Sequence, residues 1–117
     1  MRIEVRGRNY EVDEELRDHV NKRFNRVGKQ VSELATLDVI LWEEKNPAIA
    51  DNQVAEATLR LKGVTLHAEE ASPEMTHTVH ELAEDIRRQV KKHREKRRKR
   101  SRTRKLVNQL RGRTAET

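Results

Sequence analysis

The 117-residue sequence predicts one α+β domain with the element order β-α-β-β-β-α, a four-stranded sheet that carries both helices on one face. Apolar residues alternate in four short segments, which is the period of strands, and recur every three or four residues in two longer segments, which is the period of helices. The chain is long enough for one domain and too short for two. Three consecutive strands should pair as a meander, so both helices must cover the same face to bury their apolar stripes.

The first half of the chain predicts a strand, a helix and a second strand. Residues 2–8 alternate between apolar and charged types. Asp13 is the expected cap of the helix. The helical stripe consists of Leu16, Val20, Phe24, Val27 and Val31. Residues 37–42 alternate again and predict the second strand, which leads into a loop bracketed by Asn46-Pro47 and Asp51-Asn52.

The second half predicts a β-hairpin over residues 54–69, which reverses at Gly63 with a turn type that the sequence leaves open. Ser72-Pro73-Glu74 is a helix start, with Ser as the cap and Pro in the first helical position. The second helical stripe consists of Met75, Val79, Leu82, Ile86 and Val90. No Gly or Pro follows before Gly112, so the helix should continue beyond the domain, frayed by charge repulsion until an anion neutralises it.

Charge divides the chain into two unlike parts. Residues 1–86 contain 11 Lys and Arg against 18 Asp and Glu, a net charge of −7, whereas residues 87–117 contain 15 against 2, a net charge of +13. A solvated charge run is one interpretation, but such runs usually mix both signs. A contact with a polyanion is the better interpretation, and RNA is the cytoplasmic polyanion in greatest supply.

Several function classes are disfavoured by what the sequence lacks. The absence of Cys excludes disulfides and thiolate sites, and three aromatic residues are too few for a base-stacking platform. No apolar run approaches the ~20 residues that cross a bilayer, and no signal peptide is visible, so we expect a cytoplasmic protein without membrane contact. No phosphate-binding Gly loop or nucleophile motif occurs. We therefore expect no enzyme, no cofactor and no small-molecule substrate.

Histidines offer one metal-site hypothesis. His77 and His80 are three residues apart on the second helix, with Glu81 and Glu84 beside them. No zincin-type second His follows and no other cluster supplies a third ligand, so we expect surface histidines and no metal. His19 and His93 lie beside the apolar stripes and should be residues at the core boundary.

Candidate phosphate-binding residues are the Lys and Arg side chains off the two apolar stripes. The planar fork of Arg binds phosphate oxygens in pairs, and such contacts give affinity without reading sequence. Structured RNA recognised by shape is therefore favoured over duplex DNA. The candidates are Arg17, Lys22, Arg23 and Arg26 in the first helix, and Arg87, Arg88, Lys91, Lys92, Arg94, Lys96, Arg97, Arg98 and Arg100 in the second.

Short motifs occur in a fixed order along residues 1–97. They are Ile3-x-Val5-x-Gly7-x-Asn9, Leu16-Arg17-Asp18-x-Val20, Arg23-Phe24, Ala57-Thr58-Leu59, Gly63 with Leu66-His67-Ala68, Glu74-Met75 and Gln89-Val90-x-Lys92-His93-Arg94-x-Lys96. No motif is specific alone, but their ordered sum resembles the ribosome hibernation-promoting factor family, which includes ribosome-associated inhibitors and sigma-54 modulation proteins. Among these family names, ribosome binding is favoured over sigma-factor modulation.

The resemblance implies a fold similar to double-stranded-RNA-binding domains. It also implies binding to the small (30S) ribosomal subunit and its 16S rRNA, in the channel for mRNA and the A- and P-site tRNAs. Occupancy there would silence and protect idle 70S ribosomes, and the protein should be a monomer off the ribosome. The rRNA contacts that the resemblance implies are Arg17, Arg23, Arg26, Lys92, Arg94 and Lys96.

The sequence departs from the family pattern at His19 and Thr76, where the family often has aromatic residues. Long members also carry a dimerising C-terminal domain, for which the tail here is too small, so we expect a short or truncated form. The expected division is a ribosome-binding domain over 1–97 and a basic extension over 98–117, partly helical or disordered. The alternative function is general RNA binding or RNA chaperoning through the basic tail alone.

Overall fold

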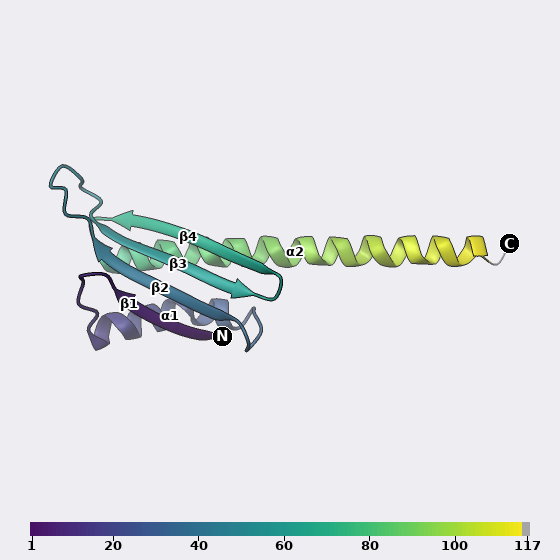
Figure 1. Ribbon diagram of the computed structural model, residues 1–117, viewed down its shortest axis with the longest axis horizontal. Helices are drawn as coiled ribbons and strands as arrows, with labels where there is room; N and C mark the ends of the chain where they lie inside the picture. Colours follow the sequence, from purple (N-terminus) through teal and green to yellow (C-terminus); the bar gives the residue numbers. More distant parts are fainter. Residues whose placement is uncertain (116–117) are drawn as a thin grey trace.

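The computed structural model describes residues 1–115, with side chains up to residue 110 (Figure 1). Its elements are β1 (Arg2–Gly7), α1 (Glu14–Gly28), β2 (Thr36–Glu43), β3 (Gln53–Leu61), β4 (Val64–Ser72) and α2 (Met75–Ala115). The predicted α+β class and the order β-α-β-β-β-α are confirmed.

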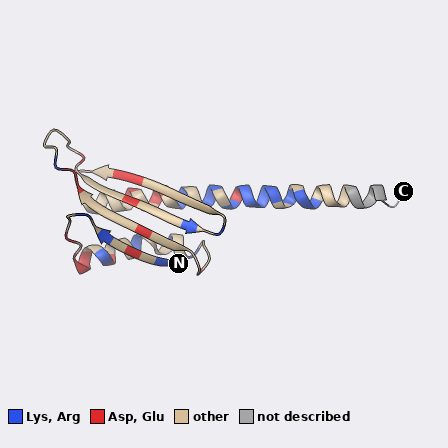
Figure 2. Cartoon of the chain, in the orientation of Figure 1, with Lys and Arg blue, Asp and Glu red and all other residues tan. Residues whose placement is uncertain are grey.

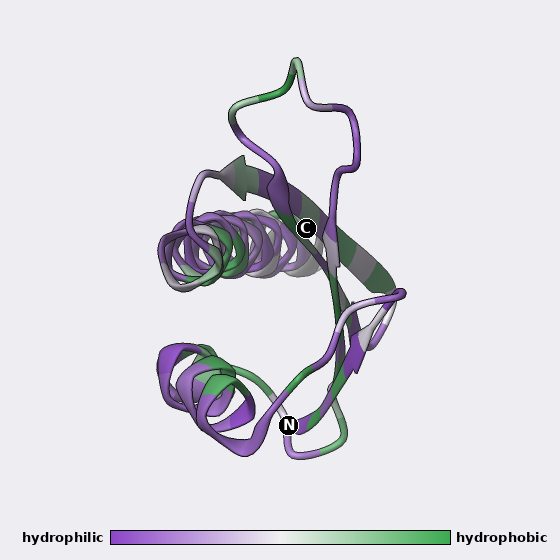
Figure 3. Ribbon diagram, turned by 90° about the vertical axis from the view of Figure 1, so that its left-hand side faces the viewer, coloured by the Kyte–Doolittle hydropathy of each residue, from purple (hydrophilic) through white to green (hydrophobic). Residues whose placement is uncertain are grey.

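The four strands form one sheet in the order β1-β2-β3-β4. β1 pairs parallel to β2, as the intervening α1 requires, and the other two pairs are antiparallel. One row of the sheet joins Val5, Val39, Ala57 and Ala68 across all four strands, and all four side chains are buried. This face is covered by both helices, while none of the described elements packs on the opposite face (Figure 3).

The core lies between that sheet face and the two helical stripes. From the helices come the buried residues Val20, Phe24, Val27, Val79, Leu82, Ile86 and Val90. The facing side of the sheet contributes Leu37, Leu41 and Leu59 as its largest buried side chains. Small residues such as Ala55 and Ala57 let α2 pack on β3 and β4. Burying each large aliphatic side chain contributes about 1.5–3 kcal/mol, so these few residues supply most of the hydrophobic stabilisation.

The N-terminus of α1 is capped as predicted, because Asp13 Oδ1 accepts the Leu16 N–H at 2.7 Å. The predicted continuation of the stripe to Val31 is wrong. α1 ends at Gly28, and Val31 packs half-buried against the core from the following loop. Val31 keeps its apolar contact because the loop folds back on the core, which helical periodicity cannot reveal.

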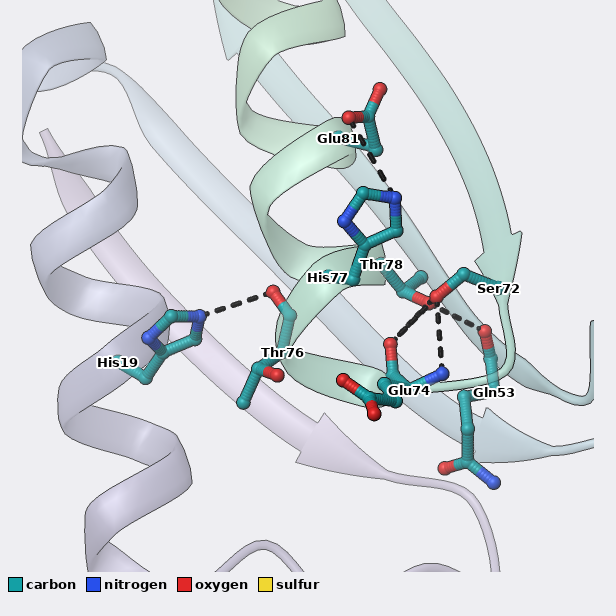
Figure 4. A network of polar contacts seen from close by, with 8 residues as sticks. All are labelled: His19, Gln53, Ser72, Glu74, Thr76, His77, Thr78 and Glu81. Atoms are coloured by element: carbon teal, nitrogen blue, oxygen red, sulfur yellow. Dashed lines mark hydrogen bonds and ion pairs between the residues drawn. The ribbon is translucent and has the colours of Figure 1, made fainter.

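The predicted start of α2 at Pro73 is also wrong, since β4 continues to Ser72 and the helix begins at Met75. The Ser72 hydroxyl lies 2.6 Å from Oγ1 of buried Thr78 and accepts the Glu74 N–H at 3.3 Å (Figure 4). Thr78 Oγ1 in turn donates to the Gln53 carbonyl at 2.8 Å. Buried hydroxyls require such partners, so Ser72 joins the helix to the sheet rather than capping a turn at Pro73.

The turn after β1 explains two residues of the first motif. A Cβ atom on Gly7 would lie 1.9 Å from the carbonyl oxygen of Tyr10, so only glycine fits. Asn9 has a φ of 48°, in the left-handed region that Asn tolerates better than most side chains. The Gly7-x-Asn9 spacing therefore has a steric cause.

The outer face of the sheet is polar, as expected, and its charges are of both signs. Thr58 Oγ1 lies 3.3 Å from Nδ1 of His67 on the neighbouring strand, and Arg60 forms an ion pair with Asp38. The guanidinium of Arg8 lies 4.6 Å from the centre of the Trp42 ring. Of these three pairs, the Arg60–Asp38 ion pair cancels charge, and Glu56 and Glu69 lie opposite each other on β3 and β4, so acidic as well as basic side chains occupy this face.

α2 extends far beyond the domain. Its last buried residue is Val90, and the following side chains through residue 110 are exposed apart from half-buried His93. The molecule is consequently 73 Å long (Figure 1). The helix runs without a break across the predicted division at residues 97 and 98, so that division stays a prediction, and residues 116–117 of the predicted extension lie outside the described residues.

Candidate nucleic-acid interface

α1 and α2 lie side by side on the sheet and run in the same direction. Near their beginnings, Nε2 of His19 lies 3.2 Å from the carbonyl oxygen of Thr76. Near the end of α1, Gln30 adjoins Lys91 and Arg94. A groove of about 290 Å³ lies between the helices, lined by His19, Lys22, Arg23, Arg26, His80, Ala83 and Glu84.

Six of the predicted phosphate-binding residues border this groove and a second hollow of about 210 Å³ further along α2. All six side chains are exposed. Spacings of three and four residues bring the members from each helix to one side of it. These six form the interhelical strip: Lys22, Arg23, Arg26, Lys91, Arg94 and Arg98.

Arg17 and Arg87 have internal partners that the sequence did not reveal. Arg17 Nη1 donates to the Val5 carbonyl at 3.1 Å, which draws its guanidinium toward β1 and away from the strip. Arg87 Nη2 donates to Glu84 Oε2 at 2.9 Å, and this hydrogen bond lowers the pKa of the Glu84 carboxyl. Glu84 therefore stays ionised beside the strip and offsets part of the Arg87 charge.

The remaining candidates lie on other sides of α2. Burial, together with the hydrogen bond and charge of Asp85, raises the pKa of the Glu70 carboxyl. Arg88 lies near Glu70, and its positive charge acts in the opposite direction and lowers that pKa. Arg97 lines a separate hollow of about 550 Å³ with His93 and Leu61. Helical geometry turns Lys92, Lys96 and Arg100 away from α1. The thirteen candidates therefore do not form one patch.

Sequence reasoning did not name every residue that the structure brings to this region. His80 and Glu84 line the groove. Their spacing of four residues, with Arg87 three residues after Glu84, is a signal in the sequence that these side chains share one face of the helix. Lys99, Arg102, Arg104 and Lys105 stand exposed on the same helix as the candidates. The predicted continuation of the helix was the signal that could have added them.

The metal hypothesis gains no support from the described part of the chain. His77 Nε2 lies 3.9 Å from Glu81 Oε1, as a helical i, i+4 pair. Among the described residues, no group of three or more His, Asp or Glu side chains is arranged to hold a metal ion. His19 and His93 are half-buried at the edge of the core, as predicted. Within the described residues 1–115, no helix has both the length and the hydropathy to span a bilayer.

The two signs of charge are separated along the long axis of the molecule. Acidic residues lie over the sheet, the start of α1 and the early turns of α2, whereas Lys and Arg dominate α2 from residue 87 onward (Figure 2). A polyanion is repelled by the first region and attracted by the second. The α2 members of the interhelical strip, Lys91, Arg94 and Arg98, belong to the second region, and its α1 members border the groove beside it.

Comparison with known proteins gives the same assignment of fold. A ribosomal subunit interface protein from Coxiella burnetii superposes with a TM-score of 0.69 at 22% identity, covering 81% of this chain and 99% of that structure. The N-terminal domain of Protein Y from Thermus thermophilus also gives 0.69, at 23% identity, covering 80% and 99%. At these identities the likeness shows the fold.

Sequence relatives carry the comparison further. A ribosome hibernation promoting factor from Pseudomonas putida is 32% identical over 82% of this chain and 89% of its own length. That of Escherichia coli K12 is 28% identical over 82% and 96%. A ribosome hibernation promotion factor from Picosynechococcus is 30% identical, and only 50% of its length is matched. These names are those of non-enzymatic ribosome factors, which confirms the prediction that the protein is not an enzyme.

The family model for Sigma 54 modulation protein / S30EA ribosomal protein matches residues 3–98, which is most of the chain. It spans every strand, α1 and the part of α2 that packs on the sheet. Together with the Pseudomonas relative, this match confirms the family resemblance seen in the sequence motifs. The chain belongs to the Sigma 54 modulation protein / S30EA ribosomal protein family.

Proposed function

We propose that this protein is a ribosome hibernation factor that binds the small (30S) ribosomal subunit through 16S rRNA. The bound protein occupies the channel for mRNA and the A- and P-site tRNAs, and thereby silences and protects idle 70S ribosomes. It acts in the cytoplasm and is a monomer off the ribosome. The family and the names of the relatives support the hibernation role.

The interhelical strip is the single observation that carries the proposed mode of binding. Lys22, Arg23 and Arg26 from α1 and Lys91, Arg94 and Arg98 from α2 border neighbouring hollows and are all exposed. Phosphate contacts by such residues fix a protein's position on folded RNA without reading its sequence. The remaining candidates on α2 add contacts from its other sides.

Steric exclusion is the proposed mechanism of silencing. A domain seated in the channel prevents mRNA and tRNA from entering, and this requires no chemistry and no cofactor. Affinity comes largely from the counterions that RNA releases when Lys and Arg replace them. Binding should therefore weaken steeply as salt rises.

Sedimentation with salt-washed ribosomes tests the proposal. The protein should co-migrate with 30S subunits and 70S ribosomes at moderate salt, and ribosomes carrying it should fail to bind mRNA and initiator tRNA. A protein that stays at the top of the gradient, or that co-migrates without blocking mRNA binding, contradicts the proposal.

A second candidate function is general RNA binding through the tail, favoured by the length of α2 that protrudes beyond the domain. Deleting residues 98–117 separates the two functions. A tail-only binder loses nearly all affinity for every RNA, whereas a docked domain keeps its preference for 30S subunits over unrelated duplex RNA.

A further inference from the structure

We propose that folded RNA surrounds the protruding basic part of α2, residues 91–105 (hereafter the extension, as distinct from the predicted division at residue 98), and contacts it on opposite sides, rather than supporting it from one side. The extension is thus inserted into a phosphate-lined space about as wide as a helix with its side chains, roughly 10–12 Å. This inference rests on the proposed function for the identity of the RNA. What the inference adds is the arrangement of the RNA, which lies on opposite sides of the extension.

The distribution of cations around the helix axis is the first observation. The extension contains 11 Lys and Arg among its 15 residues. With 3.6 residues per turn, neighbouring cations around the axis are separated by no more than about 60°. A helix built to lie on a flat surface needs its cations on one side only.

Two faces of the extension show this most clearly. The first face consists of Arg98, Arg102 and Lys105, and it continues the interhelical strip. The second face consists of Lys96, Arg100 and Arg104, and it points about 170° away around the axis, toward the side on which Ile86 is buried further back along α2. All six of these side chains are exposed.

Within the described part of the chain, the cations of the extension have almost no neutralising partners. Among the described side chains, the ion pairs of α2 are His77 with Glu81 and Arg87 with Glu84, and no Lys or Arg beyond Arg87 has a carboxylate within 4.0 Å. Glu95 is the one acid within the extension. Lys92, Lys96, Arg100 and Arg104 follow one another at spacings of four. Each like-charge pair of this kind opposes the helix.

Neutralisation from one side relieves only part of this repulsion. RNA against the first face would leave the cations of the second face without a counter-charge, and their mutual repulsion would still oppose the helix. A flexible basic tail could satisfy a flat RNA surface without holding cations apart on a helix. Phosphates on opposite sides are the arrangement that neutralises both faces while the helix is kept.

Two charge-matched triple variants and one helix-breaking variant test the inference. The first is Arg98→Gln, Arg102→Gln and Lys105→Gln; the second is Lys96→Gln, Arg100→Gln and Arg104→Gln. Each removes one Lys and two Arg. Ser101→Pro breaks the helix without changing charge, and Ser101→Ala is its control. All are full-length chains, and binding to salt-washed 30S subunits is measured as a function of salt.

We expect both triple variants to bind at least tenfold more weakly, with a salt slope lowered by roughly 2–3 for the three lost phosphate contacts. Ser101→Pro should weaken binding at least fivefold, and Ser101→Ala should leave it unchanged. The inference is overturned if one triple variant binds like the wild type, if neither is weakened, or if Ser101→Pro has no effect. Unchanged binding by Ser101→Pro would mean that the extension binds RNA as a flexible polycation and not as an enclosed helix.

Failure of this inference can be distinguished from failure of the proposed function. If the wild-type protein does not bind 30S subunits, the proposed function fails, and the same variants are compared on protein-free, folded 16S rRNA. Equal weakening of the two triple variants there, with loss in Ser101→Pro, supports enclosure by RNA. One-sided weakening, or no binding, overturns it.

Discussion

Nε2 of His19 in α1 lies 3.2 Å from the main-chain carbonyl oxygen of Thr76 in the first turn of α2 (Figure 4). A carbonyl oxygen can only accept a hydrogen bond, so His19 carries a proton on Nε2. The helices are thus joined by a polar contact at the mouth of the groove that the interhelical strip borders.

Replacing His19 by Ala should therefore loosen the two helices at that end. We expect His19→Ala to lower the free energy of unfolding by about 0.5–1.5 kcal/mol, the usual contribution of one hydrogen bond. His77→Ala is the matched control, since His77 is exposed on α2 and has only a long contact to Glu81. Urea unfolding of both variants checks the prediction, and equal losses contradict it.

Replacing Gly7 by Ala should be more costly, because the new Cβ would lie 1.9 Å from the Tyr10 carbonyl oxygen and the turn after β1 must shift. We expect a loss of about 1–3 kcal/mol, as for other forced overpacking. Gly28→Ala is the control, with Met1 Cε at 3.4 Å as its nearest neighbour, and it should be neutral or slightly stabilising. Thermal unfolding that ranks the two in the opposite order refutes the steric account.

Glu70 makes stability depend on pH. Burial, with the hydrogen bond and charge of Asp85, raises the pKa of the Glu70 carboxyl above its ordinary value of 4.5. The folded state therefore holds a proton that the unfolded state has already released, so stability falls as pH rises from about 4.5 through the folded-state pKa. Above that window the ionised form remains penalised.

Glu70→Gln removes this penalty. The variant should be more stable than the wild type at pH 7 by about 0.3–1 kcal/mol, a modest gain because the site is partly exposed to solvent. The gain in stability should vanish below pH 4, because the Glu70 carboxyl is then protonated and, like the Gln side chain, carries no charge. Glu44→Gln, in an exposed loop, is the control and should show no such pH-dependent gain. Unfolding curves at both pH values decide the matter, and a gain that persists in acid is the contrary result.

Much of the fold followed from local pattern, because each element has its own signal. The apolar stripe of Val20, Phe24 and Val27 and the Asp13 cap were sufficient for α1. The boundaries at Val31 and Ser72 were not predictable, since Val31 is held by tertiary packing and Ser72 by a hydroxyl contact to Thr78 six residues away. Periodicity reports which side of an element is apolar and is silent on such contacts.

The candidate site was predictable as a set of cations and only partly as a surface. Helical spacing correctly grouped Lys22 with Arg23 and Arg26. It could not show that Arg17 turns to the Val5 carbonyl or that Arg87 pairs with Glu84, because those partners depend on the packing of α1 beside β1 and on side-chain rotamers. The pairing of the two helices into one strip is a tertiary property.

The most direct test of the central claim compares two charge-matched triple variants in 30S binding. Lys22→Gln, Arg23→Gln and Arg26→Gln remove the α1 part of the interhelical strip; Arg2→Gln, Arg6→Gln and Lys45→Gln remove the same charges from β1 and the loop after β2. The strip variant should bind at least tenfold more weakly, with a salt slope lowered by roughly 2–3, while the other stays within about twofold of the wild type. Equal binding by the two variants would contradict the assignment of the RNA-binding surface to the groove between the helices.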